Sequence, residues 1–264
     1  LHKEYRRQRQ MCIRDSNTSQ EKTTFKDMAL ALKNNKPFLL VIISYFLGFG
    51  RQMAMGIQVQ AATVILGSQN LVAVLGIVTA VGSMISMALC PLLIKKLNER
   101  NAYILLSVYG FAASIFSFVI GHFWFQSPKN MVLTVLFYAS LFLIGLQFGA
   151  VTLMPMIMTA DAVDYYEYET GKRMEGACYS ILTLTIKVCL ALGTAVGLIF
   201  VQKSGYYESL TAGTFTTKTK DIIFFAYTAL PGILALISIF PMFKYDIVGE
   251  KKAKISYELA ARRK

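Results

Sequence analysis

Charged residues are scarce in this sequence. Of its 264 residues only 16% are charged and 55% are hydrophobic, which gives a mean hydropathy of +0.49. Soluble domains carry about 25% charged and about 45–50% apolar residues. The exterior of the protein, and not only its core, must therefore be apolar. This composition excludes an ordinary soluble domain and predicts an integral membrane protein.

Residues that build disulfide frameworks, metal sites and many catalytic sites are also few. The four cysteines form no CxxC pair, and three lie in or next to hydrophobic runs, so neither a disulfide framework nor a zinc site is expected. The only histidines are His2 and His122, and no carboxylate pair lies within a hydrophobic run. An enzyme needs such groups converging at one place. We therefore expect no enzyme, no metal site and no cofactor. The cysteines are Cys12, Cys90, Cys178 and Cys189.

Long hydrophobic runs, in contrast, fill the sequence. Each reaches about the 20 residues that an α-helix needs to cross about 30 Å of hydrocarbon. Together they leave no room for a soluble domain, and they predict an all-α fold of six transmembrane helices within residues 37–243, with the lipid bilayer as partner. The runs are residues 37–66, 71–94, 102–122, 131–157, 177–201 and 222–243.

The distribution of lysine and arginine predicts the orientation of the helices in the membrane. Nine lie before residue 37, three in residues 95–100, two at Lys172 and Arg173, and seven from Lys244 onward, whereas the other three links carry four. Basic residues favour the cytoplasmic side of a membrane. Both termini are therefore expected in the cytoplasm, with residues 244–264 as a basic tail. The net charge of +12 then has a membrane explanation, and we expect no nucleic-acid partner.

The first 36 residues differ from the rest. Residues 11–16 resemble one reading frame of a transposon-end adapter, so residues 1–16 are interpreted as a cloning or assembly scar, with a natural cytoplasmic linker as the alternative. Residues 17–36 are then a cytoplasmic linker. Within it, residues 24–35 form an amphipathic stretch suited to the membrane surface.

Polar residues follow one face of the first predicted helix. Ser44, Gly48, Arg51, Met55 and Gln58 recur at helical spacing. Arginine near the bilayer centre costs about 2.5–3.5 kcal/mol on insertion scales, so its side chain should face a partner or a wet cavity. Arg51 is therefore a candidate substrate contact, and the alternative is an arginine that reaches the interface or holds a neighbouring helix.

The fifth predicted helix carries a second intramembrane charge. Ser180, Thr183, Lys187 and Thr194 share one face, and no carboxylate of this chain lies at membrane depth to pair with Lys187. Its partner is then the substrate or another part of the protein. The alternative is a lysine satisfied by helix carbonyls and hydroxyls.

An acidic segment, residues 158–176, precedes that helix. Asp161, Asp164 and Tyr168 share a helical face, and more acids lie beside Lys172 and Arg173. Such charges suit either a latch that opens and closes or a solvated cap, and spacing alone favours neither. The additional acids are Glu167, Glu169 and Glu175.

In this segment the chain resembles the glycoside–pentoside–hexuronide:cation symporters of the major facilitator superfamily. That family has a loop of the form A-D-x-x-D-Y-x-E-Y, then an arginine, then an aromatic–serine pair that opens the next helix. The resemblance covers about residues 24–246. The matching residues here are Ala160, Asp161, Asp164, Tyr165, Glu167, Tyr168, Arg173, Tyr179 and Ser180.

The resemblance implies the C-terminal half of a twelve-helix carrier built of inverted triplets, which moves a sugar or glycoside with Na⁺ or H⁺ by alternating access across a bacterial cytoplasmic membrane. It places Lys187, Thr183, Ile186 and Ser180 with Arg51 as candidate substrate-binding residues. A cytoplasmic gate would include the residues Asp161, Asp164, Arg173, Glu167 and Tyr168.

Two departures qualify what the resemblance implies. The paired tyrosines common near the outer end of the first helix are replaced by residues 58–62 (QVQAA), so sugar stacking there is not expected. The family's cation site lies on acidic residues of the N-terminal half, which is missing here. A major facilitator transporter of a non-sugar solute and a non-transporting sensor or scaffold remain the alternatives.

Overall fold

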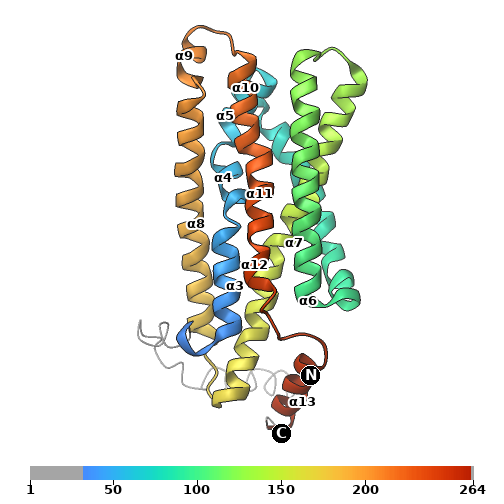
Figure 1. The fold of residues 1–264 in the computed structure, drawn as a ribbon, viewed down its shortest axis with the longest axis vertical. Helices are drawn as coiled ribbons and strands as arrows, with labels where there is room; N and C mark the ends of the chain where they lie inside the picture. The colour runs from blue at the N-terminus through green and yellow to red at the C-terminus, as the bar shows by residue number, and fades with distance from the viewer. Residues whose placement is uncertain (1–31, 263–264) are drawn as a thin grey trace, which may run out of the picture.

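A computed structural model describes residues 32–262 of the chain, and these form a bundle of helices without a strand (Figure 1). The proposed scar and most of the linker, including residues 24–31 of its amphipathic stretch, lie outside the described residues. The elements in chain order are α3 (Lys36–Leu47), α4 (Gly50–Gly56), α5 (Gln58–Leu66), η1 (Gln69–Leu71), α6 (Val72–Gln126), α7 (Met131–Thr170), α8 (Glu175–Lys203), α9 (Tyr206–Thr211), α10 (Thr217–Phe224), η2 (Phe225–Ala229), α11 (Leu230–Ile237), α12 (Ile239–Met242) and α13 (Gly249–Arg262).

Within the described residues, five helical stretches are long and apolar enough to cross a membrane. The longest, Gln69–Gln126, has 58 residues, which would extend about 87 Å as one straight helix. At Asn98 the backbone has φ 67° and ψ 163°, and the chain turns back on itself there (Figure 1). This stretch therefore makes two crossings, which correspond to the predicted helices 71–94 and 102–122. The all-α membrane fold with six crossings is confirmed.

The first predicted helix, residues 37–66, is not continuous as expected. It is divided into α3, α4 and α5, with breaks at Gly48–Phe49 and at Ile57. Close packing accompanies the break, because a Cβ atom on Gly50 would lie 2.5 Å from the Cα of Pro231 in α11. The last span, Thr217–Met242, is irregular too, since η2 is a π-helical turn ahead of Pro231.

Glycines bring pairs of helices into backbone contact. A Cβ atom on Gly145 or Gly149 of α7 would lie 2.4 or 2.1 Å from the carbonyl oxygen of Thr79 or Ser83 in α6. Gly193 of α8 packs closely on α4, because a Cβ atom there would lie 2.7 Å from the backbone nitrogen of Met53. Such contacts between small residues are typical of membrane helices. They hold α4, α6 and α7 around the cavity described below.

The predicted basic tail is a folded element and not only a tail. Most of it forms α13, which lies across the lower end of the bundle in Figure 1, beside the end of α7. Ile255 and Leu259, one helical turn apart, are 4% and 3% exposed in a cluster that includes Met158 of α7. This apolar face explains why α13 packs on the bundle. The high charge of the segment hid the face in the sequence.

Candidate substrate cavity and charge network

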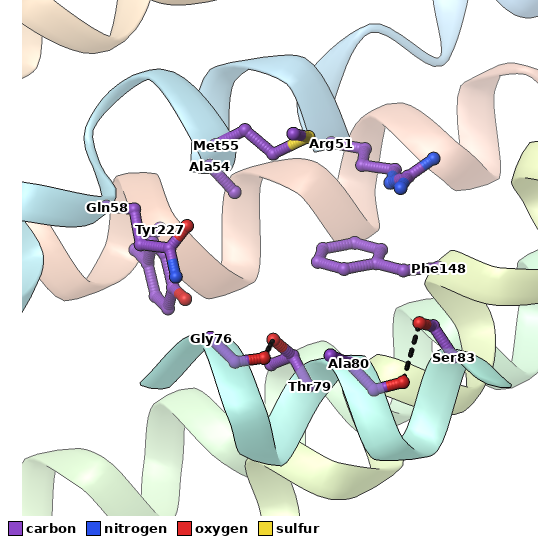
Figure 2. Close-up of a pocket in the computed structure, with 10 residues that line it drawn as sticks. All are labelled: Arg51, Ala54, Met55, Gln58, Gly76, Thr79, Ala80, Ser83, Phe148 and Tyr227. Atoms are coloured by element: carbon purple, nitrogen blue, oxygen red, sulfur yellow. Dashed lines mark hydrogen bonds between the residues drawn. The ribbon is translucent and has the colours of Figure 1, made fainter. Parts of the chain in front are cut away.

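The described part of the chain contains a cavity of about 180 Å³ between α4, the start of α5, α6, α7 and η2. α6 contributes small or hydroxyl-bearing residues, which leave space, while the larger polar and aromatic side chains come from the other elements (Figure 2). The lining residues are Arg51, Ala54, Met55, Gln58, Gly76, Thr79, Ala80, Ser83, Phe148 and Tyr227.

The two ends of the cavity differ in character. Figure 2 shows Arg51 over the ring of Phe148 at one end, and Gln58 beside Tyr227 at the other. The guanidinium carbon of Arg51 lies 5.8 Å from the ring centroid of Phe148, which is a cation–π distance. Gly76 leaves room for Gln58, because a Cβ atom at Gly76 would lie 3.1 Å from the Gln58 amide nitrogen.

The positive charge of Arg51 has few polar partners within the described residues. Its Nε atom is buried and has no hydrogen-bond partner. None of the ion pairs among residues 32–262 includes Arg51. The structure therefore places Arg51 at a cavity, as one of the two sequence interpretations requires.

The other polar residues of the first predicted helix separate at its breaks. Met55 and Gln58 line the cavity with Arg51, but Ser44 does not. The Ser44 hydroxyl donates to the carbonyl of Ser238 at 2.6 Å and lies 3.0 Å from the hydroxyl of Tyr103. The expectation of one shared polar face is therefore wrong for Ser44, because the chain breaks between it and Arg51.

The candidate substrate-binding residues of α8 lie elsewhere. Ser180, Thr183 and Lys187 are exposed on the outside of the bundle, and Ile186 is half-buried. None of them lines the cavity. The Thr183 hydroxyl donates to the carbonyl of Tyr179 at 2.8 Å, within its own helix. This chain alone thus does not bring Lys187 and Arg51 to one site.

Arg173 organises one group of charges where α7 ends and α8 begins. Its guanidinium lies 2.8 Å from Glu167, 2.9 Å from Glu175 and 3.3 Å from Asp164. α7 stops at Gly171, whose left-handed backbone (φ 70°) turns the chain so that Arg173 reaches back to α7. Burial lowers the pKa of Arg173, but the bonds to Glu167 and Glu175 outweigh it and raise the pKa above its ordinary value.

Asp161 belongs to a different group from the one expected. It lies 2.8 Å from the ammonium of Lys252 in α13, which also lies 2.5 Å from Glu99. Glu99 directly follows the reversal at Asn98, and its side chain is 6% exposed. Burial lowers the pKa of Lys252, yet its bonds to Asp161 and Glu99 outweigh that effect and raise it. The ion pairs of the predicted gate residues thus have two basic centres, Lys252 for Asp161 and Arg173 for Asp164 and Glu167.

α13 also contacts Tyr168, the last of the predicted gate residues. Arg262 donates to the Tyr168 carbonyl at 3.0 Å, and its guanidinium carbon lies 5.2 Å from the Tyr168 ring centroid. The partners Glu99, Lys252 and Arg262 were missed from the sequence. The apolar pair Ile255 and Leu259 at i, i+4, with basic residues around it, is the signal that could have found this helix.

The chain matches the family described as MFS/sugar transport protein over residues 4–249. It is 28% identical over 256 residues to the lactose permease of Lactobacillus delbrueckii subsp. bulgaricus, which covers 94% of this chain and 38% of that protein. It is 24% identical over 250 residues to the uncharacterized symporter YnaJ of Bacillus subtilis, and 23% identical over 253 residues to a putative sulfoquinovose importer of Escherichia coli. These cover 93% and 95% of this chain, and 51% of each relative.

The helices and the comparisons together define a multi-pass membrane protein of the transporter class. The chain belongs to the MFS/sugar transport protein family. The symporter-like resemblance seen in the sequence is thereby confirmed at the level of the family. The chain spans between 38% and 51% of the length of these three curated relatives.

Proposed function

We propose that this chain is the C-terminal half of a secondary transporter that moves a sugar or glycoside together with Na⁺ or H⁺ by alternating access. The observation that carries the proposal is the cavity at Arg51, lined by residues of α4, α5, α6, α7 and η2 in a member of a sugar-transport family. The names of the relatives include a permease, a symporter and an importer, all transporters and none an enzyme.

The proposed missing N-terminal half covers the polar face of α8. Lys187, Thr183 and Ser180 are exposed on one side of that helix, and a lysine facing lipid would be costly. A second six-helix unit on this side would bring Lys187 to the substrate path and supply acidic residues for the coupling cation. The length of the relatives, about twice that of this chain, supports such a unit.

The two charge groups at the α13 end of the bundle act, in this proposal, as the cytoplasmic gate. Arg173 with its three carboxylates and Lys252 with Glu99 and Asp161 join α6, α7, α8 and α13 at one level. Opening to the cytoplasm then requires some of these pairs to separate. The basic residues at this end agree with a bacterial cytoplasmic membrane and both termini inside the cell.

The test begins with the source gene upstream of residue 17. A reading frame that continues into six further hydrophobic segments with intramembrane acids supports the proposal. The complete protein is then reconstituted in vesicles, and uptake of labelled sugars is measured with an imposed Na⁺ or H⁺ gradient.

Uptake stimulated by one gradient is expected and identifies the coupling cation. Uptake of only a non-sugar solute would assign another class of substrate to the same fold. Sugar binding without uptake would contradict transport and favour a sensor. A gene that encodes no second half, in a cell with no partner half, would contradict the proposal for this polypeptide.

A further inference from the structure

We infer that the end of the bundle that carries α13 holds a binding site for an anionic phospholipid, with the lipid headgroup between the hairpin tip of α6 and the segment after α12. None of the residues of this site lines the Arg51 cavity, so the inference does not depend on the transported solute. It starts from four basic residues that the fold gathers at this place. They are Lys95, Lys96, Arg100 and Lys244.

The reversal of α6 and one hydrogen bond bring these charges together. Lys95 and Lys96 lie just before the reversal of α6, and Arg100 lies just after it. The Arg100 guanidinium donates to the carbonyl of Tyr245 at 3.3 Å, which brings Lys244, the preceding residue, beside the hairpin tip. The three lysines are exposed and Arg100 is half-buried, so an anion from outside the protein can reach them.

The carboxylates nearest to this cluster in the sequence already have other partners. Glu99 is buried and bonds to Lys252, and Asp246 bonds to Lys251. Within residues 32–262, no ion pair includes any of the four basic residues. The cluster therefore has an excess of positive charge at the end of the helices, and basic pockets in such positions bind anionic lipid headgroups.

An exposed apolar stripe leads from the cluster along the second crossing of α6. Asn101, Leu105 and Val108 share one helical face, at i, i+4 and i+7, and all are exposed. Val119 continues this face about five turns beyond Asn101. Arg100 reaches the start of the stripe, because its Nε lies 3.5 Å from the side-chain oxygen of Asn101. A charged end followed by an apolar stripe fits a headgroup and an acyl chain, whereas a soluble anion needs no such stripe.

This stripe lies on the side of the bundle that faces away from α8. In Figure 1, α11 stands between α8 and the second crossing of α6, which is drawn in green, and α6 packs on α11. The proposed second half covers the polar face of α8, so the α6 side stays open to the bilayer. Phe240 and Phe243, just before Lys244, are exposed and add apolar surface next to the cluster.

The experiment uses native mass spectrometry of the complete transporter to compare the affinities for phosphatidylglycerol and phosphatidylcholine with identical acyl chains. One double variant, Arg100→Gln with Lys244→Gln, removes two charges of the cluster, and a second, Arg100→Lys with Lys244→Arg, keeps them. The control, Lys36→Gln with Lys172→Gln, removes two exposed charges from the same end of the bundle, at the start of α3 and between α7 and α8.

We expect wild-type protein to bind phosphatidylglycerol about 10-fold or more tightly than phosphatidylcholine, because each basic residue near an anionic headgroup contributes about fivefold. Arg100→Gln with Lys244→Gln should reduce this preference to about twofold or less. If that protein does not fold, Lys244→Gln alone, at an exposed side chain, should lower the preference about fivefold. The charge-keeping variant and the control should stay within about twofold of wild type.

Four results would overturn the inference. They are equal affinity of wild-type protein for the two lipids, an unchanged preference in the folded glutamine variants, an equal loss in the control, and displacement of the lipid by free glycerol phosphate. The last result would assign the cluster to soluble anions, because glycerol phosphate carries the charge without acyl chains. Sugar uptake is measured separately, so each of these results leaves the transport proposal intact.

Discussion

The two basic side chains within the hydrophobic runs have different surroundings in the structure. Arg51 lies at the wall of a cavity within the chain, whereas Lys187 is exposed on the outside of α8. Both were predicted as substrate contacts from their position in apolar runs. For Arg51 the cavity supports that role, and for Lys187 it stays a prediction that depends on the proposed second half of the transporter.

Lys187→Ala in the complete protein should reduce sugar uptake to less than about 5% of wild type, because the change removes the only charge on a polar helix face that we assign to the substrate path. Initial rates in vesicles measure this effect. Membrane insertion, followed by the amount of full-length protein in the membrane fraction, should be unchanged. Wild-type uptake by the variant would remove Lys187 from the site.

Lys252→Ala should destabilise the protein by about 1–3 kcal/mol, because Glu99 and Asp161 are then left facing one another with side chains only 6% and 11% exposed. The variant should melt at a lower temperature and be cut faster by protease before α13. The matched control is Lys254→Ala, since that side chain is 70% exposed and lies 3.9 Å from Glu258. Equal effects of the two variants would contradict the assigned role of Lys252.

At the scale of the elements, the turn from α7 to α8 carries the Arg173 group. Asp164→Asn should slow transport severalfold while sugar affinity stays within about twofold, because the carboxylate contacts Arg173 and not the cavity. Uptake rates and calorimetric affinities, measured on the same preparation, separate the two effects. Lost affinity would instead place Asp164 in the substrate path.

The contact of α6 with α7 depends on glycine. Gly149→Ala should lower stability by about 1–3 kcal/mol, because the added Cβ would lie 2.1 Å from the Ser83 carbonyl oxygen, a backbone atom that cannot move alone. Thermal unfolding measures this change. Val135→Ala on the same helix, at a side chain 60% exposed, serves as the control and should have little effect. Unchanged melting of the glycine variant would show that α6 and α7 separate freely here.

Most helices could be predicted because each is a long apolar run, and apolar length alone determines a membrane crossing. The breaks around α4 could not, because they accompany contacts such as Gly50 on Pro231, which are distant in sequence. α13 was missed because its basic residues were already explained by orientation. Spacing indicated Arg51 and Gln58 of the cavity, but not Phe148 or Tyr227, which only the packed bundle brings there.

At the scale of the whole molecule, the chain corresponds to about half of its relatives and leaves one side of α8 polar and exposed. The half nevertheless has its own packed interior, with clusters that join α5, α6, α7 and α10 at one end and α6, α7 and α13 at the other. The cavity is lined by side chains of this chain alone.

One ammonium group, that of Lys252, contacts residues from the hairpin tip of α6 and from α7 while it is carried by α13. The Lys252 ammonium thereby links α6, α7 and α13, although Glu99 and Lys252 are 153 residues apart in the sequence. Any tilt of α6 relative to α7 must either carry α13 along or release that amine to solvent. The rate at which an amine-specific label reacts with Lys252 should therefore report how far the α13 end of the bundle has opened during turnover.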